Sequence, residues 1–310
     1  MNECETQKWV ATALDITTSE LGIAMAQRSM YNRVFIPKKG KKGHKARKRV
    51  LHVPPPELKR VQKQIKKAFD WLEWPNYVHG FVKGRSNLTA AAIHRGSGFL
   101  LTIDFKNAFD SVTLLQVEEA LTRHIGLDDT VANMLAELAT HNGRLPQGSP
   151  SSPLLFNLVV LDLDSQVFNF CNEHGFAYTR YVDEIIVSSR KPIPKANRWA
   201  IIKMCFDFGF RIAPEKVYYQ DSARQTLAVV GILLRTSGIG LSNRRKVDNL
   251  RAMLHHAEQG DNSISPESII GKLGWVKRID PSKLRTRLGK YDPNKFFSRQ
   301  YVQQVNESRK

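Results

Sequence analysis

The sequence predicts a mixed fold of helices and strands, of the α+β or α/β class. Three apolar stretches have the composition of strands: "GFLLTIDF" (98–105), "YVDEIIVS" (181–188) and "TLAVVGILL" (226–234). Segments with helical periodicity lie among them, near residues 114–125, 153–172 and 195–209. Strands interleaved with helices indicate a shared core of sheet and helices. The 310 residues, 42% of them hydrophobic, are enough to build such a core.

The charge of the chain is unusual for a folded protein. It contains 47 Lys and Arg against 29 Asp and Glu, which gives a formal net charge of +18 at pH 7. A surplus of this size attracts a polyanion, and nucleic acid is the simplest such partner. A basic enzyme with no polyanionic partner is the alternative that charge alone leaves open.

The sequence has no pattern typical of disulfides, zinc sites or membrane spans. Cys4, Cys171 and Cys205 are odd in number and widely spaced, which suits a reducing compartment. The first ten residues, "MNECETQKWV", lack the apolar segment of a signal peptide. No apolar run approaches the roughly 18 residues that a membrane span requires. We therefore expect a cytoplasmic protein with no membrane partner.

The N-terminal third predicts helices beside an exposed basic hairpin. Residues 1–30 have the pattern of one or two helices. "RVFIP" (33–37) and "RVLHVP" (49–54) are β-type runs on either side of a tip rich in Gly, Lys and Arg, as in a hairpin with an exposed loop. The run Pro54–Pro56 ends the second strand, and residues 57–72 predict an amphipathic basic helix.

Two acids stand at the ends of predicted strands in the centre of the chain. Asp104 follows an apolar strand, and Asp183 lies at a bend between two apolar runs with Glu184 beside it. Carboxylates on adjacent strands could hold a pair of hard cations such as Mg²⁺, which keeps phosphates and waters as further ligands. Two such ions stabilise the attacking and leaving oxygens of phosphoryl transfer. Because an isolated Asp is more often a turn or cap residue, the prediction rests on the pair.

The stretch "LPQGSPSSPLLFNLVV" (145–160) predicts a rigid turn that leads into a helix. Gly148 lies between Pro146 and Pro150, and both residue types favour turns. Ser151 or Ser152 could cap the helix, whose N-terminus would then face a phosphate or a base pair. A plain proline-rich helix start is the alternative.

From about Asn243 onward the sequence is helical and basic. The pattern is carried by "RRKVDNLRAMLHHAEQ" (244–259), "PESIIGKLGWVKRI" (266–279) and "KLRTRLGKY" (283–291). It predicts a separate small helical lobe with a positive face.

These stretches resemble the motifs of reverse transcriptases, in the same order. "DFKNAF" (104–109), "LPQGSPSSPLLFN" (145–157) and "YVDE" (181–184) look like motifs A, B and C. "GFVKGRS" (80–86) is similar to the motif between fingers and palm in bacterial members, and the basic hairpin to their fingers hairpin. "FRIAPEKV" (210–217) and "VVGILL" (229–234) stand where motif D and the primer-grip strand belong. The resemblance covers about residues 31–300.

Within the family, the short chain and the style of "LHVPPPELK" (51–59) point to the retron type. Two departures weaken that assignment without touching the polymerase one. Ala90 stands where retron enzymes keep Asn in "AAAIH" (90–94), and Val230 stands where they keep Thr in "VVG" (229–231). The stretch "QGSPSSP" (147–153) differs from motif B of the diversity-generating class.

The resemblance implies an α+β fold of the right-hand polymerase type. The fingers would be residues 1–98, including the N-terminal helices, and the palm, with its antiparallel sheet, residues 99–242. A fingers insertion would interrupt the palm at about 114–144, and residues 243–310 would form a small helical thumb that binds RNA or duplex.

The implied activity is that of an RNA-directed DNA polymerase with two Mg²⁺ ions. It would copy a structured non-coding RNA into DNA from dNTPs and hold an RNA–DNA hybrid. A role in anti-phage defence is implied by the retron type alone, which also leaves room for an effector protein as a partner.

The resemblance also implies roles for individual residues. The metal ligands would be Asp104, Asp183, Glu184 and the backbone carbonyl of Phe105. The nucleotide contacts would be Arg49 on the triphosphate, Phe109 against a ribose 2′-OH, and Gln147 and Gly148 on the pair of template base and nucleotide. Lys216 would complete the catalytic set as a proton donor to pyrophosphate. The alternatives are a core role for Phe109 and a surface role for Lys216.

Basic residues outside this set would contact nucleic acid. They are Lys45 and Arg47 in the hairpin tip, Arg85 and Ser86 in "GFVKGRS", and Lys272, Lys277, Arg278 and Arg285 in the C-terminal lobe. Lys45 and Arg47 could instead only solvate the tip. Trp275 could stack on a base, although a core position is more usual for such a residue.

Glu184 stands where the family usually has a second Asp. The extra methylene could misplace the carboxylate, and an error of about 1 Å in a catalytic group can cost on the order of a hundredfold in rate. The other site residues are present, and Asp104 and Asp183 can bind metal without it, so we expect an active polymerase. A non-catalytic RNA-binding scaffold with the polymerase fold, and another defence-associated bacterial reverse transcriptase, are the alternatives.

Overall fold

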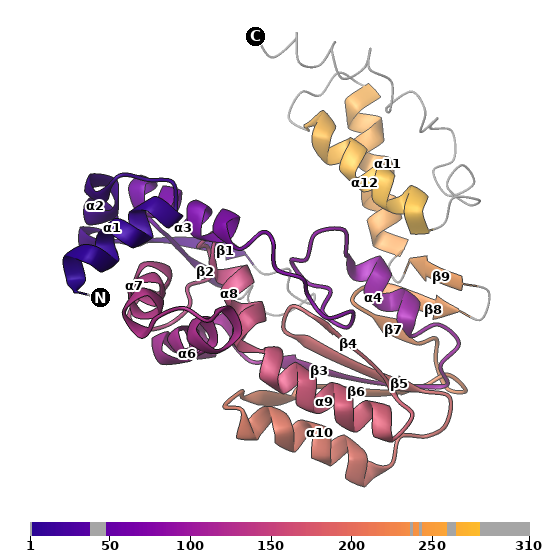
Figure 1. Cartoon of the computed structure of the whole chain (residues 1–310). Helices are drawn as coiled ribbons and strands as arrows, with labels where there is room; N and C mark the ends of the chain where they lie inside the picture. Colours follow the sequence, from indigo (N-terminus) through magenta and orange to yellow (C-terminus); the bar gives the residue numbers. More distant parts are fainter. Residues whose placement is uncertain (1, 38–47, 236–237, 242–243, 259–264, 280–310) are drawn as a thin grey trace. The chain divides into compact units, whose positions relative to one another are not determined.

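The structure, a computed structural model, describes residues 2–37, 48–235, 238–241, 244–258 and 265–279 (Figure 1). The chain forms two compact units. The first contains Met1–Ser86, Leu101–Val187 and Ile193–Tyr218, and the second contains Asn87–Leu100, Ser188–Pro192 and Tyr219–Lys310. The division into fingers (1–98), palm (99–242) and thumb (243–310) stays a prediction.

The first unit begins with two capped helices, α1 (Glu3–Ala13) and α2 (Thr18–Ala26). In each, the residue before the helix and the third residue of the helix bind each other's backbone N–H groups, Asn2 with Glu5 and Thr17 with Glu20. The helices confirm the prediction for residues 1–30.

A β-hairpin follows these helices, as the sequence predicts. β1 (Asn32–Pro37) and β2 (Lys48–Val53) pair antiparallel, and Pro37 lies opposite Lys48. The predicted basic tip, with Lys45 and Arg47, lies outside the described residues. α3 (Pro56–Ala68) begins directly after the hairpin with a proline, which starts a helix without needing a partner for an N–H group.

Helices α6 (Leu114–Ile125) and α7 (Asp129–Ala139) pack against each other, and α7 also contacts α1 and α3. Gly126 ends α6 with a φ of 78°, a conformation that glycine adopts without a Cβ penalty. The buried residues Leu121 and Leu138 belong to this helical core.

A four-stranded sheet with the order β4-β5-β3-β6 forms the centre of the fold. Its strands are β3 (Phe99–Phe105), β4 (Ala177–Tyr181), β5 (Glu184–Ser189) and β6 (Ile212–Asp221). Only Val182 and Asp183 join β4 to β5, a connection that requires antiparallel neighbours. The predicted strands at 98–105 and 181–188 are confirmed, with the bend where the sequence indicates it.

Three helices accompany the sheet: α8 (Ser152–Val159), α9 (Leu161–Glu173) and α10 (Lys195–Asp207). Figure 1 shows α9 beside the sheet, where it contacts β4, and α10 beside α9. The helical pattern predicted near 153–172 is confirmed, and it forms two helices, because α8 and α9 meet at a bend of 48°. None of the helices in the described residues alone has the length and apolarity of a membrane span, whereas the bent pair α8–α9 has both taken together.

The second unit contains α4 (Asn87–Ile93) and a three-stranded antiparallel sheet. The strands are β7 (Ala228–Val229), β8 (Ile232–Arg235) and β9 (Gly238–Leu241). The β-type stretch predicted at 226–234 forms two short strands, because Val230 and Gly231 have positive φ values of 43° and 79° and turn the chain between β7 and β8. Two such residues in succession make the turn that a two-residue hairpin favours.

Helices α11 (Arg244–Glu258) and α12 (Pro266–Ile279) also belong to the second unit and pack against each other. Leu250 and Leu254 of α11, and Ile269 and Leu273 of α12, are buried at spacings of one helical turn. These helices confirm the helical pattern predicted for residues 244–259 and 266–279.

Candidate active site

The predicted acidic residues meet at the end of the central sheet. Asp104 is the last residue but one of β3, Asp183 lies in the turn between β4 and β5, and Glu184 begins β5. β3 and β5 are neighbours, and the backbone N–H of Phe105 donates to the carbonyl of Asp183 at 3.0 Å. This main-chain hydrogen bond joins the two segments that carry the acids.

The carboxyl groups repel one another in a partly buried space. Burial raises the pKa of Asp183, and the charge of Asp104 raises it further. The pKa of Glu184 is raised to about 7 by burial first and then by the charges of Asp104 and Asp183. The three groups are therefore close enough to influence one another, and together they favour a cation.

Two basic residues supply positive charge to this cluster. Lys216, on β6, donates from Nζ to Oδ1 of Asp104, and each side chain is 38% exposed. Arg49, on β2, is exposed and lowers the pKa of Asp183 by its charge, as does Lys216. The structure thus brings both predicted cations to the acids.

The chemistry of these residues fits a hard divalent cation. Within the described ranges, no three His, Cys, Asp or Glu side chains are arranged to hold a metal ion by themselves. The donors here are nevertheless carboxylate oxygens, and the Lys216 ammonium already provides a positive charge against Asp104. Mg²⁺ accepts one or two carboxylates and completes its shell with phosphate oxygens and water.

Phe109 lies near the acids in sequence and is supported by the core. It belongs to the short helix α5 (Ala108–Ser111), which follows β3. Its ring centroid is 4.9 Å from that of Phe156, and Phe156 is fully buried. The ring of Phe109 itself is half-buried, so one part of it remains open to solvent.

The turn with Gln147 and Gly148 is attached to the hairpin strand that carries Arg49. The backbone N–H of His52, on β2, donates to the carbonyl of Gln147 at 2.7 Å. Gly148 has a φ of 125°, and a Cβ atom there would lie 2.7 Å from the carbonyl oxygen of His52. Only glycine permits this approach of the two backbones.

The serines after this turn have a different role from the predicted one. Ser151 precedes α8 but makes no side-chain cap, and Ser152 Oγ donates to the carbonyl of Pro146 at 2.8 Å. Ser149 Oγ donates to Oε1 of the buried Gln62 at 2.7 Å. The predicted capping by Ser151 or Ser152 is wrong, because Ser151 makes no side-chain cap and the Ser152 hydroxyl binds the carbonyl of Pro146 in the turn.

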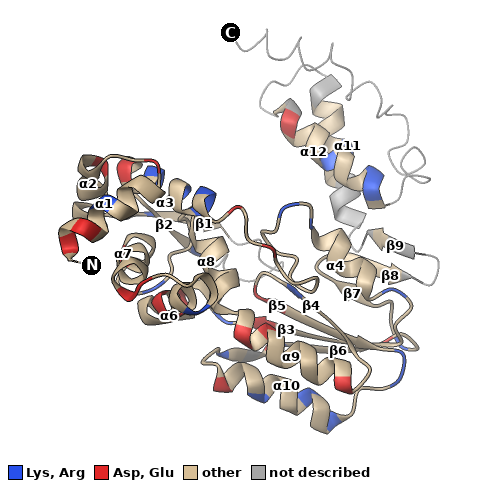
Figure 2. Ribbon diagram, viewed as in Figure 1, with Lys and Arg blue, Asp and Glu red and all other residues tan. Residues whose placement is uncertain are grey.

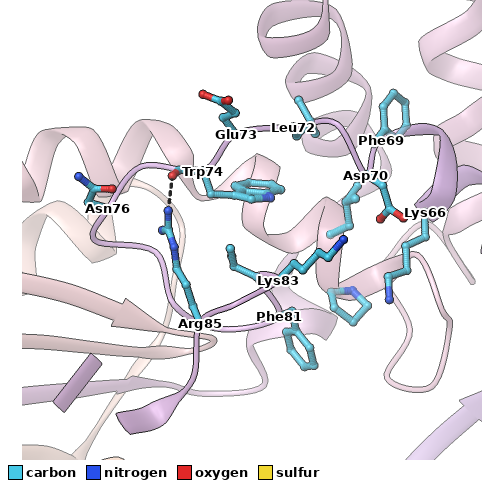
Figure 3. Close-up of a pocket in the computed structure, with 13 residues that line it drawn as sticks. Lys66, Phe69, Asp70, Leu72, Glu73, Trp74, Asn76, Phe81, Lys83 and Arg85 are labelled. Atoms are coloured by element: carbon cyan, nitrogen blue, oxygen red, sulfur yellow. Dashed lines mark hydrogen bonds between the residues drawn. The ribbon is translucent and has the colours of Figure 1, made fainter. Parts of the chain in front are cut away.

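Arg85 fastens a loop of the protein itself. Its guanidinium donates to the carbonyls of Pro75, Val78 at 2.6 Å and Trp74 at 2.7 Å. Figure 3 shows the hydrogen bond to Trp74. Ser86, the next residue, is half-buried. The sequence did not indicate this internal role of Arg85, and a contact of either residue with nucleic acid stays a prediction.

A surface pocket of about 910 Å³ lies beside this loop. Figure 3 shows Trp74, Phe81 and Lys83 around it, with Lys66 of α3 on the same rim. Phe81 is 61% exposed and has a φ of 58°, which is unusual for an aromatic residue. The sequence does not indicate this pocket, because only its lysines carry an obvious signal.

The basic residues predicted for the C-terminal lobe lie on one helix where they are described. Lys272, Lys277 and Arg278 are exposed on α12, and Figure 2 shows Lys and Arg on this helix. Trp275 is half-buried there. Arg285 lies outside the described residues.

Comparison with known proteins identifies the family. Residues 36–230, which include Asp104, Asp183 and Lys216, match the family model described as reverse transcriptase (RNA-dependent DNA polymerase). The chain is 30% identical over 275 residues to the Ec86 retron reverse transcriptase of Escherichia coli, covering 82% of each. It is 28% identical over 331 residues to the Mx162 retron reverse transcriptase of Myxococcus xanthus, covering 93% of this chain and 67% of that protein.

The fold is also found in a solved structure. The apo telomerase of Candida tropicalis superposes with a TM-score of 0.52 and 11% identity, over 90% of this chain and 61% of that one. This likeness concerns the polymerase fold alone. Because the family model matches more than half of the chain, and a relative with 30% identity matches most of both lengths, the chain belongs to the reverse transcriptases, the RNA-directed DNA polymerases, and within them to the retron type.

Proposed function

We propose that the protein polymerises DNA on a structured non-coding RNA, with catalysis at Asp104, Asp183 and Glu184. The observation that carries the proposal is the meeting of these acids at adjacent strand ends, opposite Lys216 and Arg49. The RNA template follows from the family. A role in anti-phage defence and an effector partner belong to the proposal through the retron type only, and a cytoplasmic location belongs to it through the cysteine pattern and the N-terminal sequence.

Two Mg²⁺ ions would be held by the carboxylates of Asp104, Asp183 and Glu184 and by the carbonyl of Phe105. When bound, they would stabilise the charge of the attacking and leaving oxygens of phosphoryl transfer. Burial and the neighbouring carboxylates raise the pKa of Glu184 to about 7, so a bound cation would favour its ionised form.

Lys216 and Arg49 would act on the phosphates of the incoming dNTP. Arg49 stands on the exposed hairpin, and its planar guanidinium suits a triphosphate. Lys216 would lose this contact if Asp104 held a cation, and its ammonium could then protonate the leaving pyrophosphate. The hydrogen bond between His52 and Gln147 ties the strand of Arg49 to the turn that would contact the base pair.

The pocket beside Phe81 would take part of the single-stranded template. An exposed aromatic ring can stack on a base of any sequence, and the ammonium groups of Lys66 and Lys83 can bind its phosphates. The exposed cations of α12 would contact RNA or the RNA–DNA hybrid.

A non-catalytic scaffold that binds RNA is the second candidate, and Glu184 is the observation in its favour. Ala90 and Val230 pointed to another defence-associated reverse transcriptase, and the retron relatives over most of the chain argue against that alternative. His94 belongs to the same stretch as Ala90. It is fully buried, and its Nδ1 lies 2.8 Å from the hydroxyl oxygen of Ser188. The histidine at this position therefore has a structural reason.

Primer extension on an RNA template with Mg²⁺ tests the proposal. The natural protein should extend the primer, and Asp183→Ala should abolish extension, whereas equal signal from both would end the catalytic hypothesis. Glu184→Asp should leave the rate unchanged or raise it, and complete loss would show a site built around glutamate.

Sequencing the nucleic acid that co-purifies with the protein separates the two candidates further. A covalent RNA–DNA hybrid supports the retron-type polymerase. Plain RNA supports the scaffold.

A further inference from the structure

The bend that carries the catalytic acids has a strained backbone. Val182, directly before Asp183, has a φ of 59°, which β-branched residues rarely adopt. Such a conformation persists only where the surrounding structure holds it in place. The positions of Asp183 and Glu184 therefore depend on the contacts that hold Val182.

Arg180 makes the most direct of these contacts. Its Nη1 donates to the carbonyl of Val182 and to Oδ1 of Asn157, both at 2.9 Å. Its Nε and Nη2 donate to the carboxylate of Asp164, on α9, at 2.8 Å each. One guanidinium thus connects a helix of the core to the strained carbonyl.

Gly80 and Asn157 hold the bend from a second side. A Cβ atom on Gly80 would lie 2.3 Å from the backbone nitrogen of Val182, so the two backbones are in close contact. The carbonyl of Gly80 accepts from Nδ2 of Asn157 at 2.8 Å. Asn157 therefore links Gly80 to Arg180, and Val182 lies against both.

The same network extends to the residue predicted to exclude the ribose 2′-OH. The guanidinium of Arg180 is 5.7 Å from the ring centroid of Phe156, which is 4.9 Å from that of Phe109. Arg180 thus contacts the bend that carries the acids directly, and it contacts Phe156, the ring that packs against Phe109.

The pair of Arg180 and Asp164 has no exposed surface. Removing both charges from water costs about as much as their attraction returns, so a buried pair of this kind is weak evidence for stability. What it supplies is a fixed geometry, with several hydrogen bonds of defined direction. Here that geometry ends on the carbonyl next to Asp183.

We propose that Arg180 and Asp164 are positioning residues of the polymerase, which hold the turn of Val182 so that Asp183 and Glu184 face the reacting phosphates. This inference rests on the proposed function. It predicts that loss of the pair lowers kcat while nucleotide and template binding persist, because Arg49 and the basic surfaces lie on other elements.

The main test replaces the network with apolar side chains of similar volume. The triple variant Tyr178→Phe/Asp164→Leu/Arg180→Met includes Tyr178 because its hydroxyl donates to Asp164 at 2.5 Å and would lose its acceptor. Such replacements of buried ion pairs often preserve stability. We expect a folded protein whose kcat for single-nucleotide incorporation falls roughly ten- to hundredfold, with the KM for dNTP changed less than threefold.

The matched control is an ion pair at the surface in which one partner lies on the same helix as Asp164. Arg123 and Asp162 join α6 to α9 at 2.5 Å without touching the bend. Arg123→Met/Asp162→Leu should leave both kcat and KM unchanged. A second test variant, Arg180→Lys, keeps the buried charge beside Asp164 but cannot reach both partners, and its kcat should also fall at least about tenfold.

The outcomes separate this inference from the proposed function. A folded triple variant or a folded Arg180→Lys with kcat within twofold of the control would overturn the inference alone, given an active natural protein. Failure of both variants to fold would assign the pair to the core and overturn it too. A natural protein that extends primers no better than Asp183→Ala would overturn the proposed function and the inference together.

Discussion

Nζ of Lys216 donates a hydrogen bond to Oδ1 of Asp104, so the predicted proton donor of the site is in direct contact with a predicted metal ligand. The pair is partly exposed to water, with each side chain 38% accessible. A metal ion that binds Asp104 has to compete with this ammonium group. Metal binding and release of the lysine are therefore linked.

Lys216→Met should separate the two consequences of this contact. Without the competing ammonium, the Mg²⁺ concentration that gives half of the thermal stabilisation should fall severalfold. Without the proton donor, the rate of nucleotide incorporation should fall on the order of a hundredfold. Thermal unfolding at increasing MgCl₂ and single-turnover incorporation measure these effects.

Lys203→Met is the control for this variant. Lys203 forms an exposed ion pair with Asp207 on α10 at 2.6 Å, away from the acids. It should change neither the Mg²⁺ midpoint nor the rate. A full rate in Lys216→Met would support the alternative of a surface lysine.

His79 should make the stability of the protein depend on pH. It is 4% exposed, and burial together with the charge of Arg85 lowers its pKa from 6.5 to about 4. The unfolded chain then binds a proton at a higher pH than the folded one. The stability that the neutral His79 contributes to the folded protein is fully present above pH 6.5. It is lost as the pH falls towards 4, by up to about 3 kcal/mol of unfolding free energy. Urea unfolding of the natural protein and His79→Gln between pH 4 and 7 measures it.

His79→Gln removes the titrating group, so its free energy of unfolding should fall less across this pH range. His174→Gln, at the exposed end of α9, is the control for replacing a histidine by glutamine at the surface. Equal slopes in the natural protein and His79→Gln would mean that other groups cause the acid sensitivity.

The acidic site was predictable because its signals are local. Asp104 lies near the end of an apolar strand and Asp183 at the bend between two strands, and acids at such points are visible in a few residues of sequence. That β3 and β5 are neighbours could not be read from these residues. The resemblance implied that the two acids lie together, and in the structure the hydrogen bond from the Phe105 N–H to the Asp183 carbonyl joins the segments that carry them.

The parts that the sequence analysis missed depend on contacts between distant residues or on unusual backbone. Arg180 and Asp164 belong to different elements, and an apolar pattern does not show that two charged residues share the core. Val230 has a positive φ although it is β-branched. Asn or Asp usually occupies such a turn position, so the sequence lacked the usual signal for the turn between β7 and β8. Arg85 was predicted to contact nucleic acid, and its internal role was not visible, because its partners are backbone carbonyls, which any sequence supplies.

Phe81→Ala should weaken the binding of single-stranded RNA by roughly tenfold, because a stacked base contributes about 1–3 kcal/mol. Lys83→Ala should instead lower the dependence of affinity on salt, by about 0.7 in the log–log slope for one phosphate contact. Fluorescence anisotropy with a labelled oligonucleotide at several salt concentrations measures both effects.

Trp199→Ala is the matched control for the aromatic substitution. Trp199 is 58% exposed on α10 and does not line the pocket. Its loss should leave RNA affinity unchanged. If Phe81→Ala and Trp199→Ala have equal effects, stacking in this pocket is not how the template binds.

Phe109→Ala should reduce the discrimination between dNTPs and rNTPs. The ring of Phe109 rests against the fully buried Phe156 at 4.9 Å, so it cannot easily yield to an extra hydroxyl group on the sugar. Removing the ring should raise kcat/KM for CTP relative to dCTP by at least about tenfold, within the range that a change of pocket shape produces. Phe168→Ala, a partly exposed residue of α9, is the control and should leave the ratio unchanged. An unchanged ratio of kcat/KM values in Phe109→Ala would make Phe109 a core residue only, because removing a ring that touches the sugar must change the discrimination between dCTP and CTP.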